Sequence, residues 1–370
     1  MSIDTDFAII GAGMAGASLA YELAGRARTL LIEREAQPGY HTTGRSAALY
    51  SETYGNDVIR RLTSAGRPFF TAPPAGFAEH PLLTPLGCLF IARSDQQSSL
   101  AAHMAGSDRI RLVEAAEALR MVPALRPDYV AAAAHEPDAM DIDVHGLHQG
   151  FLRGARARGA ELLCDAGVEA VERRRGAWEI TTKAGTIRAA VLVNAAGAWA
   201  EALGAMAGAK PIGLMPLRRT ALIIDPPPGT DPHGWPMVID AEETFYFKPD
   251  AGRLLASPCD ETPSPPCDAQ AEELDIAICI DRLQQAADLP VRRVLRSWAG
   301  LRSFVADRTP VVGFDPDIEG FFWLAGQGGY GIQTAPALGR AAAALATGGS
   351  IPADMAVAEA ALAPGRLTRR

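Results

Sequence analysis

The sequence lacks the features that mark secreted, disulfide-bonded and membrane-spanning proteins. Its five cysteines contain no CxxC pair, and their spacing fits neither a disulfide framework nor a zinc site. The opening residues, MSIDTDFAIIGAG, carry two acids and no basic stretch before a short apolar run, which is typical of neither a signal peptide nor a spanning helix. We therefore expect a cytoplasmic protein with free thiols and no stable membrane insertion.

Positive charge is also scarce, because 35 lysines and arginines face 43 acidic residues and give a formal net charge of −8. This balance disfavours a nucleic acid as the main partner. His145 and His148, which lie near several aspartates, are typical of surface or capping residues at a helix start. We therefore expect no metal site.

Glycine, by contrast, is abundant, with 36 residues that cluster between apolar strands and helices. The first cluster, GAGMAG at 11–16, follows an apolar run at 6–10 and precedes a helical pattern that ends near Gly25. A second apolar run at 29–32 then ends on Glu33 and completes a βαβ unit. Two later units repeat the order of strand, small-residue loop and helix. The first has its strand at 190–194, its loop at 195–198 and its helix at 199–207. The second has its strand at 321–325, its loop at 326–331 and a helix to about 347.

The first unit has the spacing of a dinucleotide-binding turn. Gly11 permits a tight turn, Gly13 lets the backbone approach a pyrophosphate, and Gly16 lets the helix pack closely on the strand. Glu33 stands where a carboxylate can accept hydrogen bonds from ribose hydroxyls. The motif alone does not separate NAD from FAD. A flavin would explain the third unit, because a helix N-terminus after Gly331 would stabilise an anionic reduced ring; a plain connecting loop is the alternative.

Between these units lie stretches of another character. Residues 51–144 are punctuated by prolines, and 211–304 read as strands separated by Pro/Gly loops. We predict an α/β protein of two domains, which together make it α+β. One is a Rossmann-like nucleotide-binding domain, and the other is an inserted, mostly antiparallel β-sheet domain for the substrate. The predicted segments are 1–50, 145–210 and 305–370 for the first domain, and 51–144 and 211–304 for the second.

Two local patterns mark the return of the chain to the first domain. Residues 143–160 have the pattern of a helix with Asp143 as its N-cap. A hairpin follows, with strands at 168–172 and 178–182 that turn at RRRG, residues 173–176. The arginines of this turn are expected to be solvated.

Six segments make a family resemblance specific. They are EREAQPGYHTTGRSAA, PPAGFAEHPLL, VLVNAAGAWA, FYFKPDAG, WAGLRSFVAD and GFFWLAGQGGYGIQT, and they span nearly the whole chain. The sequence resembles the superfamily of FAD-dependent D-amino-acid oxidases and dehydrogenases, which includes glycine and sarcosine oxidases, and is most similar to bacterial D-arginine and D-amino-acid dehydrogenases. The resemblance implies an antiparallel domain that covers the flavin. Because no cysteine lies between Arg302 and Gly331, where some relatives attach the cofactor, we expect non-covalent FAD.

The resemblance also implies cofactor-binding roles, residue by residue. For the ADP half these fall on Gly11, Gly13, Ala15, Gly16, Glu33 and Arg34, with Val168 at the adenine and Ala196 and Gly197 as a second contact. For the pyrophosphate and flavin they fall on His41, Thr42, Gly44, Arg45, Ser46 and Ala47, and around the ring on Arg302, Gly328, Gly329, Tyr330, Gly331, Ile332 and Gln333.

For the substrate, the resemblance implies an α-amino acid whose carboxylate is bound by Arg219 and Arg302, with help from the hydroxyls of Tyr54 and Tyr246. Arginine suits this role because a guanidinium binds a carboxylate in a bidentate fork. Strand alternation turns Arg218 and Arg219 to opposite faces, so only one of them is expected to reach the pocket. The small and apolar neighbours of Arg302 indicate that it meets a buried anion.

The implied reaction is oxidative deamination, in which a hydride passes from the substrate Cα to flavin N5 and the imino acid hydrolyses to a 2-oxo acid and ammonia. Relatives that prefer D-arginine carry a carboxylate in the stretch that corresponds to 85–88 and a histidine at the position of Leu49. Here Leu49 and Cys88 occupy those places, and Gly329 and Tyr330 complete the implied substrate contacts. We therefore predict a preference for neutral or apolar side chains, unless a carboxylate elsewhere supplies the charge. The candidates for that carboxylate are Glu79, Glu242 and Glu243.

Two other function classes stay open. A sarcosine- or glycine-type secondary-amine oxidase would form hydrogen peroxide, and Lys248, on the strand face of Tyr246, could attract O₂ to the flavin. A non-catalytic nucleotide-binding protein would not be reduced by any amine. The resemblance favours a dehydrogenase that passes electrons to an acceptor such as a quinone.

Overall fold

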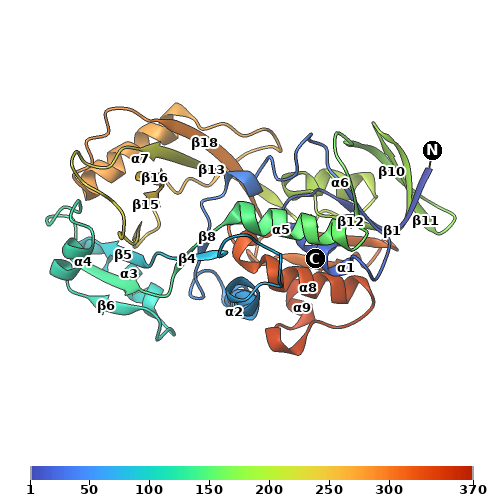
Figure 1. The fold of residues 1–370 in the computed structure, drawn as a ribbon, viewed down its shortest axis with the longest axis horizontal. Helices are drawn as coiled ribbons and strands as arrows, with labels where there is room; N and C mark the ends of the chain where they lie inside the picture. The colour runs from blue at the N-terminus through green and yellow to red at the C-terminus, as the bar shows by residue number, and fades with distance from the viewer. Residues whose placement is uncertain (1, 369–370) are drawn as a thin grey trace.

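A computed structural model of the chain describes residues 2–368 and arranges them in two lobes, each built around one large sheet (Figure 1). The first lobe holds an eight-stranded sheet and the second a nine-stranded sheet. Between the lobes, a small sheet joins β3 (Leu49–Tyr50), β4 (Leu83–Pro85) and β8 (Met140–Ile142). The predicted fold class, a Rossmann-like sheet combined with a mostly antiparallel one, is confirmed.

The first sheet is parallel at its centre, in the order β9, β2, β1, β12 and β20. The β10–β11 hairpin pairs with the first half of β12, and β19 pairs with β20, both antiparallel. All of β2 and β20 is buried, as expected for strands whose two faces are covered. The strands are β1 (Ser2–Ile10), β2 (Thr29–Ile32), β9 (Glu161–Leu163), β10 (Val168–Arg174), β11 (Ala177–Thr182), β12 (Gly185–Asn194), β19 (Val311–Phe314) and β20 (Phe321–Ala325).

Helices cover both faces of this sheet. On one face α1 (Met14–Leu23), α5 (Val144–Ala157) and α8 (Gly331–Ala346) share one apolar core, and α6 (Ala200–Met206) belongs to a second core. Asp143 caps α5, as predicted, because its carboxylate accepts a hydrogen bond from a backbone amide of the first turn at 2.8 Å. None of the helices described for residues 2–368 is long and apolar enough to span a bilayer. Short helical turns lie at η1 (Thr43–Arg45), η2 (Ser94–Gln96), η3 (Gly197–Trp199), η4 (Ala353–Met355), α9 (Glu359–Leu362) and α10 (Gly365–Thr368).

Helix α2 (Asp57–Thr71) differs from the sequence analysis, which recognised only prolines in this region. Its buried side includes Ile59, Leu62 and Phe70, although Pro68 stands in its last turn. Leu62 and Phe70 belong to the same core as α1 and α8. Helix α2 therefore packs on the first lobe, although it lies within residues 51–144.

The second sheet is antiparallel except where β5 and β14 run parallel. Its order is β17, β13, β16, β15, β14, β5, β7 and β6, and β18 also pairs with β13. Helix α7 (Glu273–Ala286) contributes Leu283 to the core of this lobe, beside Leu222 and Phe247. The strands are β5 (Cys88–Ala92), β6 (Arg111–Val113), β7 (Ala132–Glu136), β13 (Met215–Ile224), β14 (Met237–Asp240), β15 (Tyr246–Asp250), β16 (Arg253–Ser257), β17 (Thr262–Pro263) and β18 (Arg296–Phe304), and two further helices are α3 (Gln97–Met104) and α4 (Ala115–Met121).

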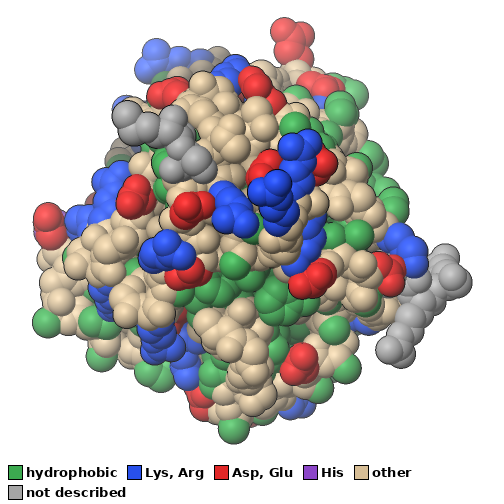
Figure 2. Space-filling view, turned by 90° about the vertical axis from the view of Figure 1, so that its right-hand side faces the viewer, with side chains coloured by type: hydrophobic (Ala, Val, Ile, Leu, Met, Phe, Trp, Pro, Cys, Tyr) green, Lys and Arg blue, Asp and Glu red, His purple; other side chains and the backbone are tan. Residues whose placement is uncertain are grey.

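The end of the molecule that carries the β10–β11 hairpin has basic and acidic side chains interspersed (Figure 2). Arg173, for example, pairs with Glu319 at 2.7 Å. The hairpin turns at Arg175 and Gly176, with φ of +49° and +78°, so its strands are longer and its turn is tighter than predicted. The arginines of this hairpin therefore lie among acids rather than in a patch of one sign.

Candidate active site

The turn between β1 and α1 packs directly on the turn that follows β12. Gly11 has φ of +102°, and a side chain there would overlap the backbone of Ala195. A side chain at Gly16 would overlap the Gly11 carbonyl oxygen. Gly13 is the N-cap of α1 and borders a cavity. The turn therefore presents bare backbone and a helix N-terminus, which suits a pyrophosphate.

This cavity has a volume of about 700 Å³, within the range of small-molecule and cofactor sites. Loops of the first lobe line one part of it, and strands β13, β15 and β18 of the second lobe line another. Among the residues singled out in the sequence, those that line the cavity are Gly11, Gly13, Ala15, Glu33, Arg34, His41, Thr42, Arg45, Ser46, Ala47, Val168, Ala196, Gly197, Arg219, Tyr246, Arg302, Gly328, Gly329, Gly331 and Ile332.

Glu33 is buried at the end of β2, and two backbone amides fix its carboxylate. Its Oε2 accepts from the Ala12 amide at 3.0 Å and its Oε1 from the Glu35 amide at 3.1 Å. Each carboxylate oxygen has a second lone pair for a further donor. A ribose hydroxyl is such a donor, so the position predicted for Glu33 fits a nucleotide.

Thr43 and Trp199 are among the lining residues that the sequence analysis missed. The Thr43 hydroxyl accepts a hydrogen bond from the Met14 amide at 3.0 Å, in the first turn of α1. The Trp199 ring lies 4.7 Å from the Arg34 guanidinium carbon and 4.7 Å from the centre of the His41 ring. Their place in the sequence could have indicated this role, because both residues adjoin predicted ones in the segments HTTGR and AAGAW.

Arg45 borders the cavity, but its guanidinium bonds elsewhere. It donates to the carbonyl oxygens of Ala269 at 2.8 Å and Ala299 at 2.9 Å, and it pairs with Asp268. These partners belong to the second lobe. The structure thus places this guanidinium as a bond between the lobes, rather than at a pyrophosphate or flavin as expected.

The loop before α8 brings glycines against the second lobe. Gly328 has φ of +54°, and a side chain there would overlap the Phe304 ring. A Cβ on Gly329 would lie 2.9 Å from the Arg302 Nη1. Helix α8 begins at Gly331, which lines the cavity, so the positive end of the helix dipole lies at the cavity wall.

Gln333 and Tyr330 were also expected at the ring, but neither side chain lines the cavity. Gln333 is buried against α2, where its Nε2 donates to the Thr63 hydroxyl at 3.0 Å and its Oε1 accepts from the Ser51 amide at 3.4 Å. The Tyr330 ring packs edge-on against Tyr54, with 5.0 Å between ring centres. The start of α8 therefore directs the Gln333 side chain toward α2, and the N-cap residue Tyr330 toward the segment before α2.

Arg219 and Arg302 reach the cavity from the neighbouring strands β13 and β18, and Tyr246 reaches it from β15. Arg218 faces the opposite side of β13 and pairs with Asp275 at 2.8 Å, as strand alternation predicts. No acidic side chain of residues 2–368 forms an ion pair with Arg302. This cation is therefore available to an anionic ligand.

The two tyrosines have different places. Tyr246 is buried and lines the cavity, whereas Tyr54 packs against Tyr330 and does not line it. Burial raises the pKa of both phenols, and the nearby charge of Arg302 opposes this shift. Both phenols therefore keep their protons and can act as hydrogen-bond donors.

Leu49 and Cys88, the predicted residues for the substrate side chain, do not line the cavity. Leu49 packs against a small cluster that contains Tyr246. Cys88 is fully buried in β5, and burial raises the pKa of its thiol, which makes it unreactive. Gly44 also lies outside the cavity wall, where a Cβ would be 2.6 Å from the Gly39 carbonyl oxygen.

Most of the charged residues considered for the substrate side chain or for O₂ are also placed elsewhere. Glu79 is exposed, and Glu242 bonds to a glutamine of its own lobe. Glu243 is exposed in the β14–β15 turn with φ of +52°, but it lies near enough to Tyr54 and Tyr330 for its charge to help burial raise the pKa of both phenols. Lys248 pairs with Asp141 of β8 and does not line the cavity.

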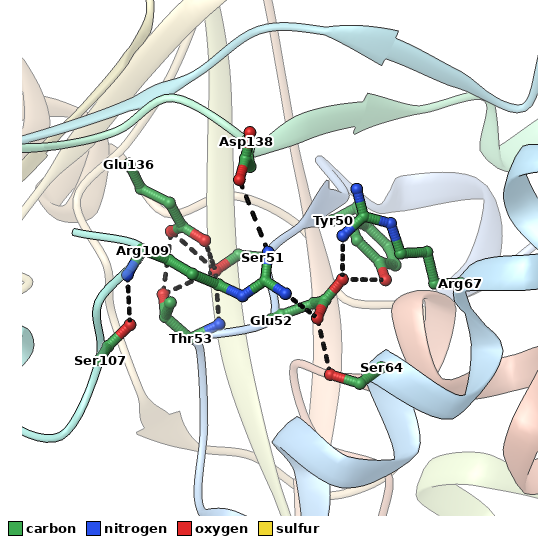
Figure 3. Close-up of polar contacts among 10 residues, drawn as sticks. All are labelled: Tyr50, Ser51, Glu52, Thr53, Ser64, Arg67, Ser107, Arg109, Glu136 and Asp138. Carbon is green, nitrogen blue, oxygen red and sulfur yellow. Dashed lines mark hydrogen bonds and ion pairs between the residues drawn. The ribbon is translucent and has the colours of Figure 1, made fainter. Parts of the chain in front are cut away.

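The segment that first crosses between the lobes is bonded to β7 of the second lobe (Figure 3). Glu136 is buried there and accepts hydrogen bonds from the Ser51 and Thr53 hydroxyls, each at 2.9 Å. Burial raises the pKa of Glu136, and the two hydroxyl donors offset only part of this shift. These bonds fix the residues that directly precede Tyr54.

The same segment is held from the other side by Glu52 (Figure 3). Its carboxylate pairs with Arg67 at 2.9 Å and Arg109 at 3.2 Å, and accepts a hydrogen bond from the Ser64 hydroxyl at 2.8 Å. Burial alone would raise the pKa of Glu52, but these donors and charges lower it. Glu52 is therefore an ionised partner of α2, whereas Glu136 has hydroxyl partners.

Comparisons with known proteins agree with this geometry. Glycine oxidase of Geobacillus kaustophilus is 24% identical over 353 residues, which cover 90% of each chain. The crystal structure of that oxidase has a TM-score of 0.84 at 23% identity and covers all of both chains. Hydrogen cyanide synthase subunit HcnC of Pseudomonas aeruginosa is 26% identical over 411 residues, covering 95% of this chain and 94% of that protein. The structure of iminodiacetate oxidase from Chelativorans sp. BNC1 has a TM-score of 0.81 at 23% identity, with 97% and 98% of the chains covered.

The model of one family, described as FAD dependent oxidoreductase, matches residues 6–345. This match covers both lobes and includes the glycine turn, Glu33 and the two cavity arginines. The resemblance identified in the sequence is confirmed. The chain belongs to the FAD dependent oxidoreductase family and is an FAD-dependent oxidoreductase of amines or amino acids.

Proposed function

We propose that the protein is an FAD-dependent D-amino-acid dehydrogenase that deaminates substrates with neutral or apolar side chains. The observation that carries this proposal is the pair Arg219 and Arg302 in the cavity wall, with Arg302 unpaired by any acid of residues 2–368. An unpaired cation that is partly removed from water favours an anionic partner. An α-amino acid supplies a carboxylate next to the carbon that is oxidised.

The residues present fit the cofactor. The bare turn at Gly11 and Gly13 and the fixed carboxylate of Glu33 would hold the ADP half, and Gly329 and the start of α8 at Gly331 would hold the ring end. We expect this binding to be non-covalent. Bound FAD supplies the two-electron acceptor for the hydride of the substrate Cα.

The main contribution of the chain is to bind and orient the substrate. Arg302 and Arg219 would bind its carboxylate, and the protonated phenol of Tyr246 would donate a hydrogen bond. The acids in the described lining are Glu33, Asp165 and Glu169, and the backbone joins the segment of Asp165 to that of Glu33. Because these acids lie with the nucleotide-binding residues, we propose that the substrate enters as the free amine. The imino acid then hydrolyses to a 2-oxo acid and ammonia.

Two placements support the finer parts of the proposal. Leu49 packs against the apolar cluster that contains Tyr246, which favours neutral side chains. Of the carboxylates considered for a guanidinium, Glu79 is exposed and Glu242 bonds to Gln96, whereas the charge of Glu243, also exposed, reaches Tyr54. Lys248 is paired with Asp141, so its ammonium is not free to attract O₂. This favours an acceptor such as a quinone.

A glycine- or sarcosine-type secondary-amine oxidase is the second candidate. The similarity to glycine oxidase and to iminodiacetate oxidase favours it. In that case the same two arginines would bind the carboxylate of glycine or of an N-substituted amino acid, and O₂ would accept the electrons.

One experiment separates these possibilities. The purified protein with bound FAD is mixed anaerobically with D-amino acids, L-amino acids and N-methyl amino acids, and the flavin absorbance is recorded. We expect rapid bleaching by D-leucine, D-methionine and D-phenylalanine, and little hydrogen peroxide in air. Preference for D-arginine would refute the proposed specificity, and bleaching only by N-methyl amino acids or glycine would favour the second candidate.

A further inference from the structure

Arg219 is held from behind by an acidic loop that the proposed reaction does not use. Its Nε donates to the Asp260 carbonyl oxygen at 2.9 Å, and its Nη2 lies 3.3 Å from the Glu261 Oε1. The Asp260 carboxylate bonds instead to Thr220, through the backbone amide at 2.7 Å and the hydroxyl at 3.0 Å. Glu261 is therefore the carboxylate that faces Arg219.

The same carboxylate binds a second guanidinium. Arg308, in the loop between β18 and β19, donates to Glu261 Oε1 at 2.6 Å and to Oε2 at 3.0 Å, which is a bidentate pair. The Arg308 guanidinium carbon also lies 3.9 Å from the centre of the Phe304 ring. Glu261 thus bridges two cations from separate segments, and it lies in direct contact with a residue of the cavity wall.

The charges at this end of the cavity are unequal. Two guanidiniums, on Arg219 and Arg308, share the Glu261 carboxylate, and the third, on Arg302, forms no ion pair with an acid among the described residues. Burial alone would raise the pKa of Glu261, but the bonds from Arg308 and the charges of the arginines lower it, so Glu261 is ionised. A ligand carboxylate at Arg302 would therefore meet the free charge of Arg302, the guanidinium of Arg219 that is shared with Glu261, and the negative charge of Glu261.

We propose that Glu261 is a specificity-determining residue that limits this site to ligands with a single carboxylate. By occupying Arg308 and sharing Arg219, it leaves one binding place for a carboxylate, and its own charge repels a second one. The proposal deepens the proposed function by naming the substrate class: monocarboxylic rather than dicarboxylic amino acids. It concerns ligand binding, so it can be tested without turnover.

The test compares the full-length FAD-bound wild-type protein with Glu261→Gln. Acetate and benzoate, then malonate and succinate, are titrated while the flavin difference spectrum is recorded, and a Kd is obtained for each. In Glu261→Gln, we expect the ratio of the dicarboxylate Kd to the monocarboxylate Kd to fall by about tenfold or more. Glu273→Gln, which removes an exposed charge from α7, should leave the ratio unchanged.

Two further variants guard against a purely structural effect. Glu261→Asp retains the charge and should restore discrimination against dicarboxylates. Arg308→Met leaves Glu261 without its bidentate partner and should strengthen that discrimination. A wild-type protein that binds malonate as tightly as acetate, or an unchanged ratio in Glu261→Gln, overturns the inference.

Turnover provides a separate readout. If the proposed function holds, the kcat/KM for D-aspartate relative to that for D-alanine should also rise in Glu261→Gln. If no amine reduces the wild-type flavin, the proposed function fails, while the carboxylate titrations still decide the role of Glu261.

Discussion

Replacing Arg302 by methionine is expected to weaken substrate capture strongly while leaving the fold at least as stable. The guanidinium borders the cavity, and no acid of residues 2–368 pairs with it. A ligand carboxylate would therefore be its main counter-charge. Methionine retains most of the apolar stem, so the change removes the charge and the hydrogen-bond donors more than the packing against Gly329.

The magnitude follows from the loss of one partner of a desolvated charge pair, which costs about 2–5 kcal/mol. Arg219 stays in the site, so the lower half of that range applies, and about 2–3 kcal/mol corresponds to roughly a 30- to 150-fold fall in kcat/KM. The opposite sign is expected for stability. Because the charge has no acidic partner in the free protein, its removal lowers the cost of burial and should hold or raise the Tm.

The assay is anaerobic reduction of the bound flavin by the best D-amino acid, with thermal unfolding measured on the same samples. Arg188→Met, at an exposed position on β12, serves as the matched control for loss of an arginine. An unchanged kcat/KM in Arg302→Met would remove this residue from the substrate site. A large fall in Tm would show instead that Arg302 has a structural partner.

The remaining expectations concern the cofactor and the dependence on pH. Acid or denaturant should release all of the FAD, as measured by absorbance of the filtrate, because no covalent link is expected. Gly11→Ala should yield protein without FAD and with a lower Tm, since the new methyl group would overlap the Ala195 backbone. Burial raises the pKa of Glu136 above 4.5, so the unfolded chain loses this proton first as the pH rises. In thermal melts Glu136→Gln should therefore gain stability relative to wild type as the pH rises above about 4.5. Burial lowers the pKa of His148, which bonds to a carbonyl oxygen of the glycine turn at 2.8 Å, so the unfolded chain binds this proton first and wild type should lose Tm relative to His148→Gln as the pH falls below 6.5.

The parts of the fold that the sequence predicted well are those whose signal is local. The strand 321–325 is bounded as predicted because both of its faces are covered and its whole run is apolar. The glycine turn and Glu33 belong to one βαβ unit, in which Glu33 follows Gly11 by 22 residues, so their spacing alone places them together. Helix α2 also carried a local signal, since Ile59, Leu62 and Phe70 recur at helical spacing, but the prolines near it obscured the pattern.

The details of the site that could not be predicted depend on rotation and on distant partners. The sequence places the loop before α8 at the cavity, but only the rotation of the helix decides that Ile332 lines the wall while Gln333 faces α2. Arg45 follows the same rule. Its segment is at the cavity, but its guanidinium bonds to carbonyl groups more than 200 residues later in the chain, at Ala269 and Ala299.

The two cavity arginines show most clearly what residue type alone leaves open. Arg219 and Arg302 carry the same charge and occupy neighbouring strands, so the sequence assigned them the same role. The fold then brings Glu261, 42 residues from Arg219, to one of them and leaves the other without an acidic partner among the described residues. Because an ion-paired guanidinium has fewer free donors than an unpaired one, the two positions differ in what they offer to a ligand. The affinity of this site for a carboxylate therefore depends on Glu261, which lies behind the cavity wall, as much as on Arg219 and Arg302, which line it.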